Sequence, residues 1–81
     1  MESKALVDVL IERGRQKERW LDPRMDDQEW LPILVEEVGE TAKAIGEGVT
    51  RDGETPRDEL VQVAAVAIGW IEDIDRRACG G

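Results

Sequence analysis

A nearly uninterrupted apolar run limits the folds open to this chain. Residues 60–71 read LVQVAAVAIGWI, and only Gln62 and Gly69 interrupt the apolar character. The spacing of the flanking polar residues predicts a helix over about 56–77, and a helix that is apolar nearly all round must be covered on most of its sides. The other elements of the fold must therefore pack around this helix.

The start of that helix is marked by Thr55 as N-cap, Pro56 at the first helical position and Asp58 at the capping-box position. Two earlier stretches also have helical periodicity. One covers about 3–21, begins at Ser3 and ends before a proline.

The other helical stretch covers about 27–45, with Asp26 and Glu29 at the spacing of a capping box. Glycines at 46 and 48 are expected to end it. Its apolar side chains form one stripe, which the pattern predicts to face the core. The stripe consists of Leu31, Leu34, Val35, Val38, Ala42 and Ile45.

These patterns predict an all-α fold in a single domain, residues 1–81, with three helices in each protomer. Two other helices of this length cannot cover the run at 60–71 alone, so we expect a homo-oligomer, a dimer or tetramer, with this helix at the subunit interface. Small domains often need such an additional stabilising element. Cys79 is the only cysteine, which excludes an intrachain disulfide and favours a cytoplasmic location.

Charge and composition exclude several functions. The formal net charge is −8, which disfavours binding to a nucleic-acid polymer. No signal-peptide pattern and no apolar run long enough to span a bilayer are visible, so no membrane partner is expected. The sequence has no histidine, which removes histidine-based catalysis and most zinc sites.

Side chains with carboxylate or amide oxygens recur at a spacing of three on two helices. Glu37 and Glu40 lie on nearly the same side of the second helix, and Glu59 and Gln62 repeat that spacing on the third. Antiparallel packing of the two helices would bring four oxygen-bearing side chains around one point. Oxygen ligands favour a hard cation, Mg²⁺ or else Mn²⁺. The alternative is a solvated acidic face without a metal.

Three segments together are similar to the MazG-like family of all-α nucleoside triphosphate pyrophosphohydrolases, in particular its short phage and bacterial members. They are WLPILVEEVGETAKAI, RDELVQVAAVAIGWIE and the charged ERGRQKERW near the start, and the resemblance covers about residues 8–76. The family carries an ExxE pair on one helix and an ExxD pair on the next. The resemblance implies that Glu37, Glu40 and Glu59 bind the metal, and that Gln62 stands where the family usually has aspartate.

The resemblance further implies Mg²⁺-dependent hydrolysis of a nucleoside triphosphate to the monophosphate and pyrophosphate. Glu37 and Glu40 would act in catalysis with the metal, and Glu36 is the candidate for the base or for support of the site. The substrate phosphates need cations, and Trp20 could stack on the base. The candidate substrate-binding residues are Lys43, Arg57, Arg15, Arg19 and Trp20.

Gln62 can coordinate a cation through its amide oxygen, but it supplies no charge and no base. An alternative function therefore stays open, namely a catalytically weak or inactive nucleotide-binding or helical interaction protein of the same fold.

Overall fold

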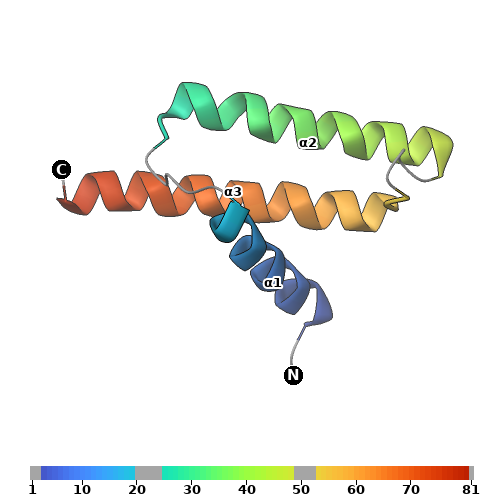
Figure 1. Cartoon of the computed structure of the whole chain (residues 1–81), viewed down its shortest axis with the longest axis horizontal. Coiled ribbons are helices and arrows are strands. Elements are labelled where there is room, and N and C mark those ends of the chain that lie inside the picture. The colour runs from blue at the N-terminus through green and yellow to red at the C-terminus, as the bar shows by residue number, and fades with distance from the viewer. Residues whose placement is uncertain (1–2, 20–24, 49–52, 81) are drawn as a thin grey trace.

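The computed structural model describes residues 3–19, 25–48 and 53–80, which form three α-helices: α1 (Lys4–Arg19), α2 (Asp27–Glu47) and α3 (Pro56–Gly80). No strand occurs in these residues, so the predicted all-α class is confirmed. Helices α2 and α3 lie side by side, and α1 crosses the other face of α3 (Figure 1). The apolar helix α3 is thus the central element, in contact with both others.

Local capping explains where the helices begin. The side chain of Asp26 accepts a hydrogen bond from the Glu29 backbone N–H at 2.9 Å, and the Glu29 side chain accepts one from the Asp26 N–H at 3.3 Å. At α3, the Asp58 carboxylate accepts from the Thr55 N–H at 3.0 Å, and the Thr55 hydroxyl accepts from the Asp58 N–H at 3.2 Å. Both predicted capping boxes are confirmed.

The helix ends differ slightly from the prediction. Helix α2 continues through the glycine at 46 and ends at Gly48, whose positive φ of 88° is readily adopted only by glycine. Helix α3 runs three residues past the expected end at 77. The expected end of the first helix, near 21, lies outside the described residues.

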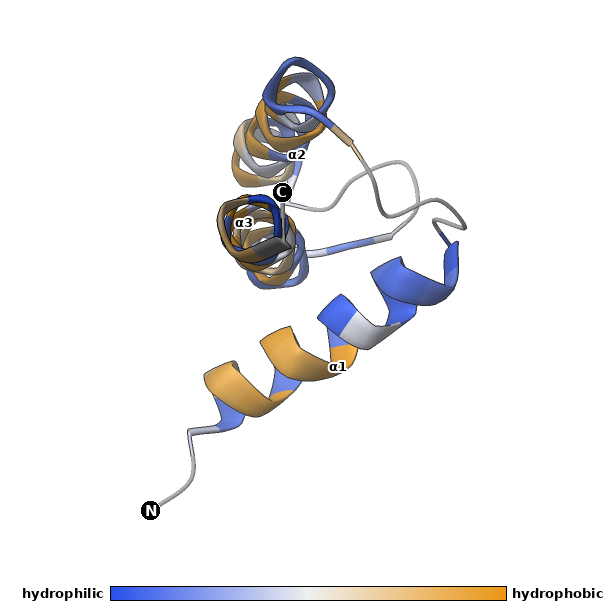
Figure 2. Ribbon diagram, turned by 90° about the vertical axis from the view of Figure 1, so that its left-hand side faces the viewer, coloured by the Kyte–Doolittle hydropathy of each residue, from blue (hydrophilic) through white to orange (hydrophobic). Residues whose placement is uncertain are grey.

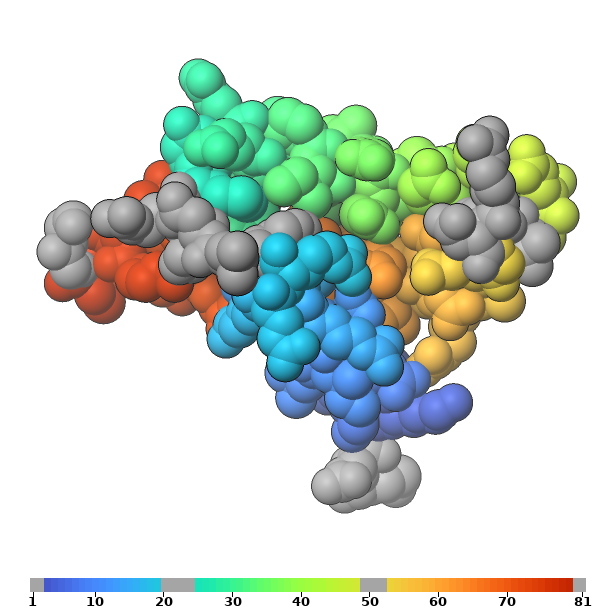
Figure 3. Space-filling model, in the orientation of Figure 1, coloured from blue at the N-terminus to red at the C-terminus, as the bar shows by residue number. Residues whose placement is uncertain are grey.

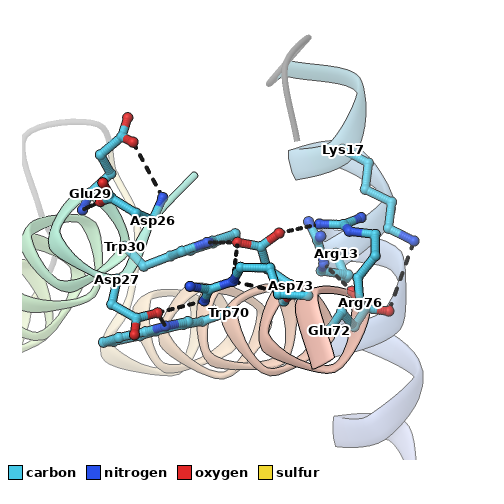
Figure 4. Close-up of polar contacts among 11 residues, drawn as sticks. Arg13, Lys17, Asp26, Asp27, Glu29, Trp30, Trp70, Glu72, Asp73 and Arg76 are labelled. Carbon is cyan, nitrogen blue, oxygen red and sulfur yellow. Dashed lines mark hydrogen bonds and ion pairs between the residues drawn. The ribbon is translucent and has the colours of Figure 1, made fainter. Parts of the chain in front are cut away.

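The buried apolar core is small. Among the described residues it consists of Val9, Trp30, Ala44, Ala65 and Val66. Trp30 is 2% exposed, and its indole N–H donates to Asp73 of α3 at 2.9 Å. Asp73 also pairs with Arg76, and the indole N–H of Trp70 donates to Asp27 at 2.8 Å (Figure 4). These bonds fix the start of α2 against the C-terminal half of α3.

The predicted apolar stripe of α2 is not the face that packs on α3. Val35, Val38 and Ile45 are 58%, 51% and 69% exposed, whereas Thr41 and Ala44 are buried. The prediction that this stripe lies in the core of a single chain was wrong. The small side chains of Thr41 and Ala44 allow α2 to approach α3 closely, and the hydrogen bond from Trp30 to Asp73 sets the rotation of α2. Most of the stripe thus stays exposed at the surface, and we call its exposed residues the outer stripe of α2. In Figure 2, hydrophobic and hydrophilic segments alternate around α2.

Candidate functional site: an acidic hollow beside a polar pocket

The carboxylates predicted from sequence lie around one hollow of about 290 Å³ between the end of α1, the middle of α2 and the start of α3. We call it the acidic hollow. Its lining residues are Arg19, Glu36, Glu37, Glu40, Glu54, Glu59 and Gln62. Five glutamates and one arginine give it a strongly negative charge.

The rotation of α2 explains this arrangement. The same face that buries Thr41 and Ala44 also turns Glu37 and Glu40 towards α3, where both are half-buried. Glu59 lies in the first turn of α3 and is 5% exposed. Three of the side chains that the spacing predicted to share a site, Glu37, Glu40 and Glu59, are therefore brought together by the antiparallel helices α2 and α3.

Burial and the crowding of carboxylates raise the pKa of two glutamates in the acidic hollow. Burial, a hydrogen bond with Glu54 and the charges of neighbouring glutamates raise the pKa of Glu59 to about 7. Burial and the charge of Glu36 also raise the pKa of Glu37. Glu59 is within hydrogen-bonding reach of both Glu37 and Glu54, so a proton on Glu59 relieves part of the repulsion.

Gln62 lines the hollow, but its side chain already has a partner. Its amide oxygen accepts a hydrogen bond from the Gln16 side-chain amide of α1 at 3.3 Å. To coordinate a cation, this oxygen would have to leave Gln16. The missing negative charge at Gln62 is matched by a carboxylate that the sequence analysis did not select, Glu54.

Glu54 lies just before Thr55 and hydrogen-bonds with Glu59. It belongs to the segment between α2 and α3, so helical periodicity could not place it. Its position next to a helix start was the only available signal, since the residue before an N-cap lies close to the first turn of the helix.

A second hollow, the α1–α3 pocket, adjoins the first and has a volume of about 230 Å³. Glu54 and Gln62 line both hollows. The other lining residues come from α1 (Asp8, Ile11, Glu12 and Arg15) and from α3 (Arg57, Asp58 and Val61). In the space-filling view, α1 lies across the middle of α3, and the start of α3 emerges beside it (Figure 3).

The predicted substrate-binding cations are only partly gathered. Arg19 lines the acidic hollow, while Arg15 and Arg57 line the α1–α3 pocket. Arg57 pairs with Asp8 at 2.9 Å. Lys43 is exposed on α2 and is not among the residues that line either hollow in the described part of the chain. Trp20 lies outside the described residues.

The donor set of the acidic hollow suits a hard cation, because it offers carboxylate and amide oxygens and no nitrogen or sulfur ligand from histidine or cysteine. Among the described residues, no three acids already stand in a finished coordination arrangement. A cation bound here would compete with a proton for Glu59, whose pKa is raised to about 7. In the same residues no helix is long and apolar enough to cross a membrane.

Comparisons with known proteins add no family assignment: no protein-family model, curated protein or solved structure matches this chain.

Proposed function

We propose that this protein hydrolyses nucleoside triphosphates to the monophosphate and pyrophosphate with the help of Mg²⁺ or Mn²⁺. The observation that carries the proposal is the gathering of Glu37, Glu40, Glu54 and Glu59 around one hollow. The raised pKa of the buried Glu59 supports it, because a divalent cation would relieve the repulsion between carboxylates that contributes to this raised pKa.

Glu37, Glu40 and Glu59 would hold the cation, with Glu54 supplying the charge that Gln62 lacks. A bound cation would neutralise phosphate charge and lower the pKa of a water molecule. The oxygen of a water molecule would attack the α-phosphorus, and the bond from this phosphorus to the α–β bridging oxygen would break, so that pyrophosphate would leave.

The proton of the attacking water has to pass to a carboxylate. Glu36 lines the hollow and is exposed, so it can approach the water without binding the cation. Arg19 of α1 also lines the hollow, where it can contact the phosphates. Arg15 and Arg57 can reach the same substrate only from the neighbouring pocket. Lys43 and Trp20 remain weaker candidates.

We further propose that copies of the chain associate through the outer stripe of α2. A compact monomer of this mass exposes about 4,900 Å², whereas this 9.1-kDa chain exposes 5846 Å². The excess of roughly 900 Å² is close to the ~800 Å² that each partner buries in a standard interface. This changes the expected interface, which the sequence assigned to α3.

The competing function is a weak or inactive nucleotide-binding protein of the same fold. It is favoured by the Gln16–Gln62 hydrogen bond, which occupies the oxygen expected to coordinate the cation. In either case we expect the protein in the cytoplasm, where nucleoside triphosphates and Mg²⁺ are abundant.

The test is a panel of nucleoside triphosphates with Mg²⁺, with pyrophosphate and orthophosphate quantified separately. We expect pyrophosphate as the phosphate product, and its loss in Glu40→Gln. Glu47→Gln is the matched control, because Glu47 is an exposed acid on the same helix. Nucleotide binding without turnover would support the competing function, and full activity of Glu40→Gln would show that the site is misplaced.

A further inference from the structure

Glu12 of α1 is a buried carboxylate with an unused oxygen. It is 5% exposed, and among the described residues its Oε2 atom has no hydrogen-bond partner. The closest cations are Arg15 at 3.6 Å from Oε1 and Arg19 at 3.9 Å from Oε2, both beyond normal hydrogen-bond length. A buried carboxylate oxygen without a hydrogen-bond donor is costly, and the two arginines compensate its charge but do not donate to Oε2 at this distance, so a ligand that brings N–H groups would stabilise it.

The surroundings of Glu12 favour an uncharged ligand group over a phosphate. The α1–α3 pocket is lined by four acids and only two arginines, and Arg57 is already paired with Asp8. Ile11 and Val61 add apolar wall, and Ile11 is 51% exposed, so a flat ring could cover it. These features suit a nucleobase better than a polyphosphate.

The pocket also lies at the right place for a base. Glu54 and Gln62 border it and the acidic hollow alike. A nucleotide whose phosphates lie at the acidic hollow can therefore extend its other end over these two residues towards Glu12. This placement of the nucleotide rests on the proposed function.

Base chemistry then selects among the nucleotides. A carboxylate only accepts hydrogen bonds and has two oxygens side by side. Guanine presents two adjacent N–H donors, N1–H and the 2-amino group, on its Watson–Crick edge. On the same edge, adenine and cytosine present one donor next to a ring-nitrogen acceptor, and uracil and thymine present one N–H between two carbonyl groups. Each of these four bases would therefore place an acceptor against one carboxylate oxygen.

We propose that Glu12 binds the guanine base of the substrate in the α1–α3 pocket, so that the protein prefers guanine nucleotides. Arg15 and Arg19 then turn from Glu12 to the phosphates. The preference depends on the 2-amino group, because hypoxanthine keeps N1–H and lacks that second donor.

The test measures binding without turnover, by isothermal titration of triphosphate analogues with a non-cleavable α–β methylene bridge in the presence of Mg²⁺. We expect the GTP analogue to bind most tightly and the ITP analogue, which lacks the 2-amino group, to bind about 10- to 100-fold more weakly. In Glu12→Gln the two should bind with similar affinity. Glu18→Gln is the control, because Glu18 is an exposed acid of the same helix.

Equal affinity for all bases, a preference for another base, or a GTP preference that survives in Glu12→Gln would overturn the inference. The comparison of GTP and ITP analogues on the natural chain stands even if Glu12→Gln fails to fold. If no triphosphate binds, the proposed function fails and this inference fails with it. If triphosphates bind and are hydrolysed without regard to the base, only the inference about Glu12 fails.

Discussion

At the scale of single residues, Gly69 of α3 is the described glycine whose surroundings leave no room for a side chain. A Cβ atom at this position would lie 2.9 Å from Trp30 Cη2 and 2.9 Å from Arg13 Cζ. Trp30 is buried and held by its hydrogen bond to Asp73, so it cannot move aside easily. Glycine here permits α1 and α2 to approach the two faces of α3.

We therefore expect Gly69→Ala to lower the free energy of unfolding by about 1–3 kcal/mol. Gly14→Ala is the matched control, because nothing lies within 4 Å of the added methyl group. That control should be neutral or stabilising by up to about 1 kcal/mol, since alanine is the better helix former. Urea unfolding measures the free energy of unfolding of both variants. Equal values would show that Trp30 and Arg13 leave room for a methyl group at position 69.

In the proposed site, Glu54 would supply the negative charge that Gln62 lacks, whereas the sequence pointed to Asp58 or Glu36 as the compensating neighbour. The i, i+3 spacing predicted which side chains of α2 and α3 could share a site, because helical geometry fixes such neighbours. It could not predict Glu54, whose position depends on the path of the connecting segment, nor the Gln16 bond that occupies Gln62, because that bond joins residues 46 positions apart.

Replacement of Glu54 tests this role. We expect Glu54→Gln to weaken Mn²⁺ binding by roughly tenfold, because one of the negative charges facing the cation is lost. Gln62→Asp should strengthen binding if its side chain can leave Gln16. Isothermal titration measures both. Unchanged Mn²⁺ affinity in Glu54→Gln would show that Glu54 is no ligand.

At the scale of helices, local sequence predicts where each element begins but not which face it buries. The starts of α2 and α3 are fixed by hydrogen bonds between residues three apart, which a reader of the sequence can recognise. The rotation of α2 depends on Trp30 meeting Asp73 across 43 positions, which no local pattern encodes. An apolar stripe predicts which side of a helix is buried. It does not predict whether the surface that buries it belongs to the same chain or to another copy.

The outer stripe of α2 gives a prediction at this scale. We expect Val35→Lys to shift the protein towards the monomer, because a charge in the centre of an apolar interface is left without a partner. Gln28→Lys, which adds the same charge at an exposed polar position of α2, should leave association unchanged. Sedimentation velocity over a range of concentrations distinguishes them, and a natural chain that stays monomeric at all concentrations contradicts the proposed interface.

At the scale of the whole molecule, the acidic hollow makes stability depend on pH. The pKa of Glu59 is raised to about 7 by burial and neighbouring carboxylates. The folded state thus holds this proton more tightly than the unfolded state, and the resulting stabilisation is lost as the pH rises from the ordinary glutamate range through about 7. Burial opposes ionisation of Asp73, but its bonds to Arg76 and Trp30 outweigh burial and lower its pKa, so its contribution is lost only in acid.

Without divalent cations, we expect the free energy of unfolding to be greater near pH 5 than near pH 8, by about 1–3 kcal/mol. Glu59→Gln should reduce this difference, because it removes the titrating group. Added Mg²⁺ should restore stability to the natural chain at the higher pH and have little effect on the variant. Urea unfolding at one fixed protein concentration measures these differences, and a natural chain most stable near pH 8 without cations would contradict the account.

In the proposed function, the acidic hollow directs water to the α-phosphorus of a nucleoside triphosphate. The most direct measurement is turnover with Mg²⁺ in water enriched in the heavy isotope of oxygen, with both products analysed by mass spectrometry. We expect one heavy oxygen in the nucleoside monophosphate and none in the pyrophosphate. Heavy oxygen in pyrophosphate, release of orthophosphate as the first product, or no turnover of any triphosphate would contradict it.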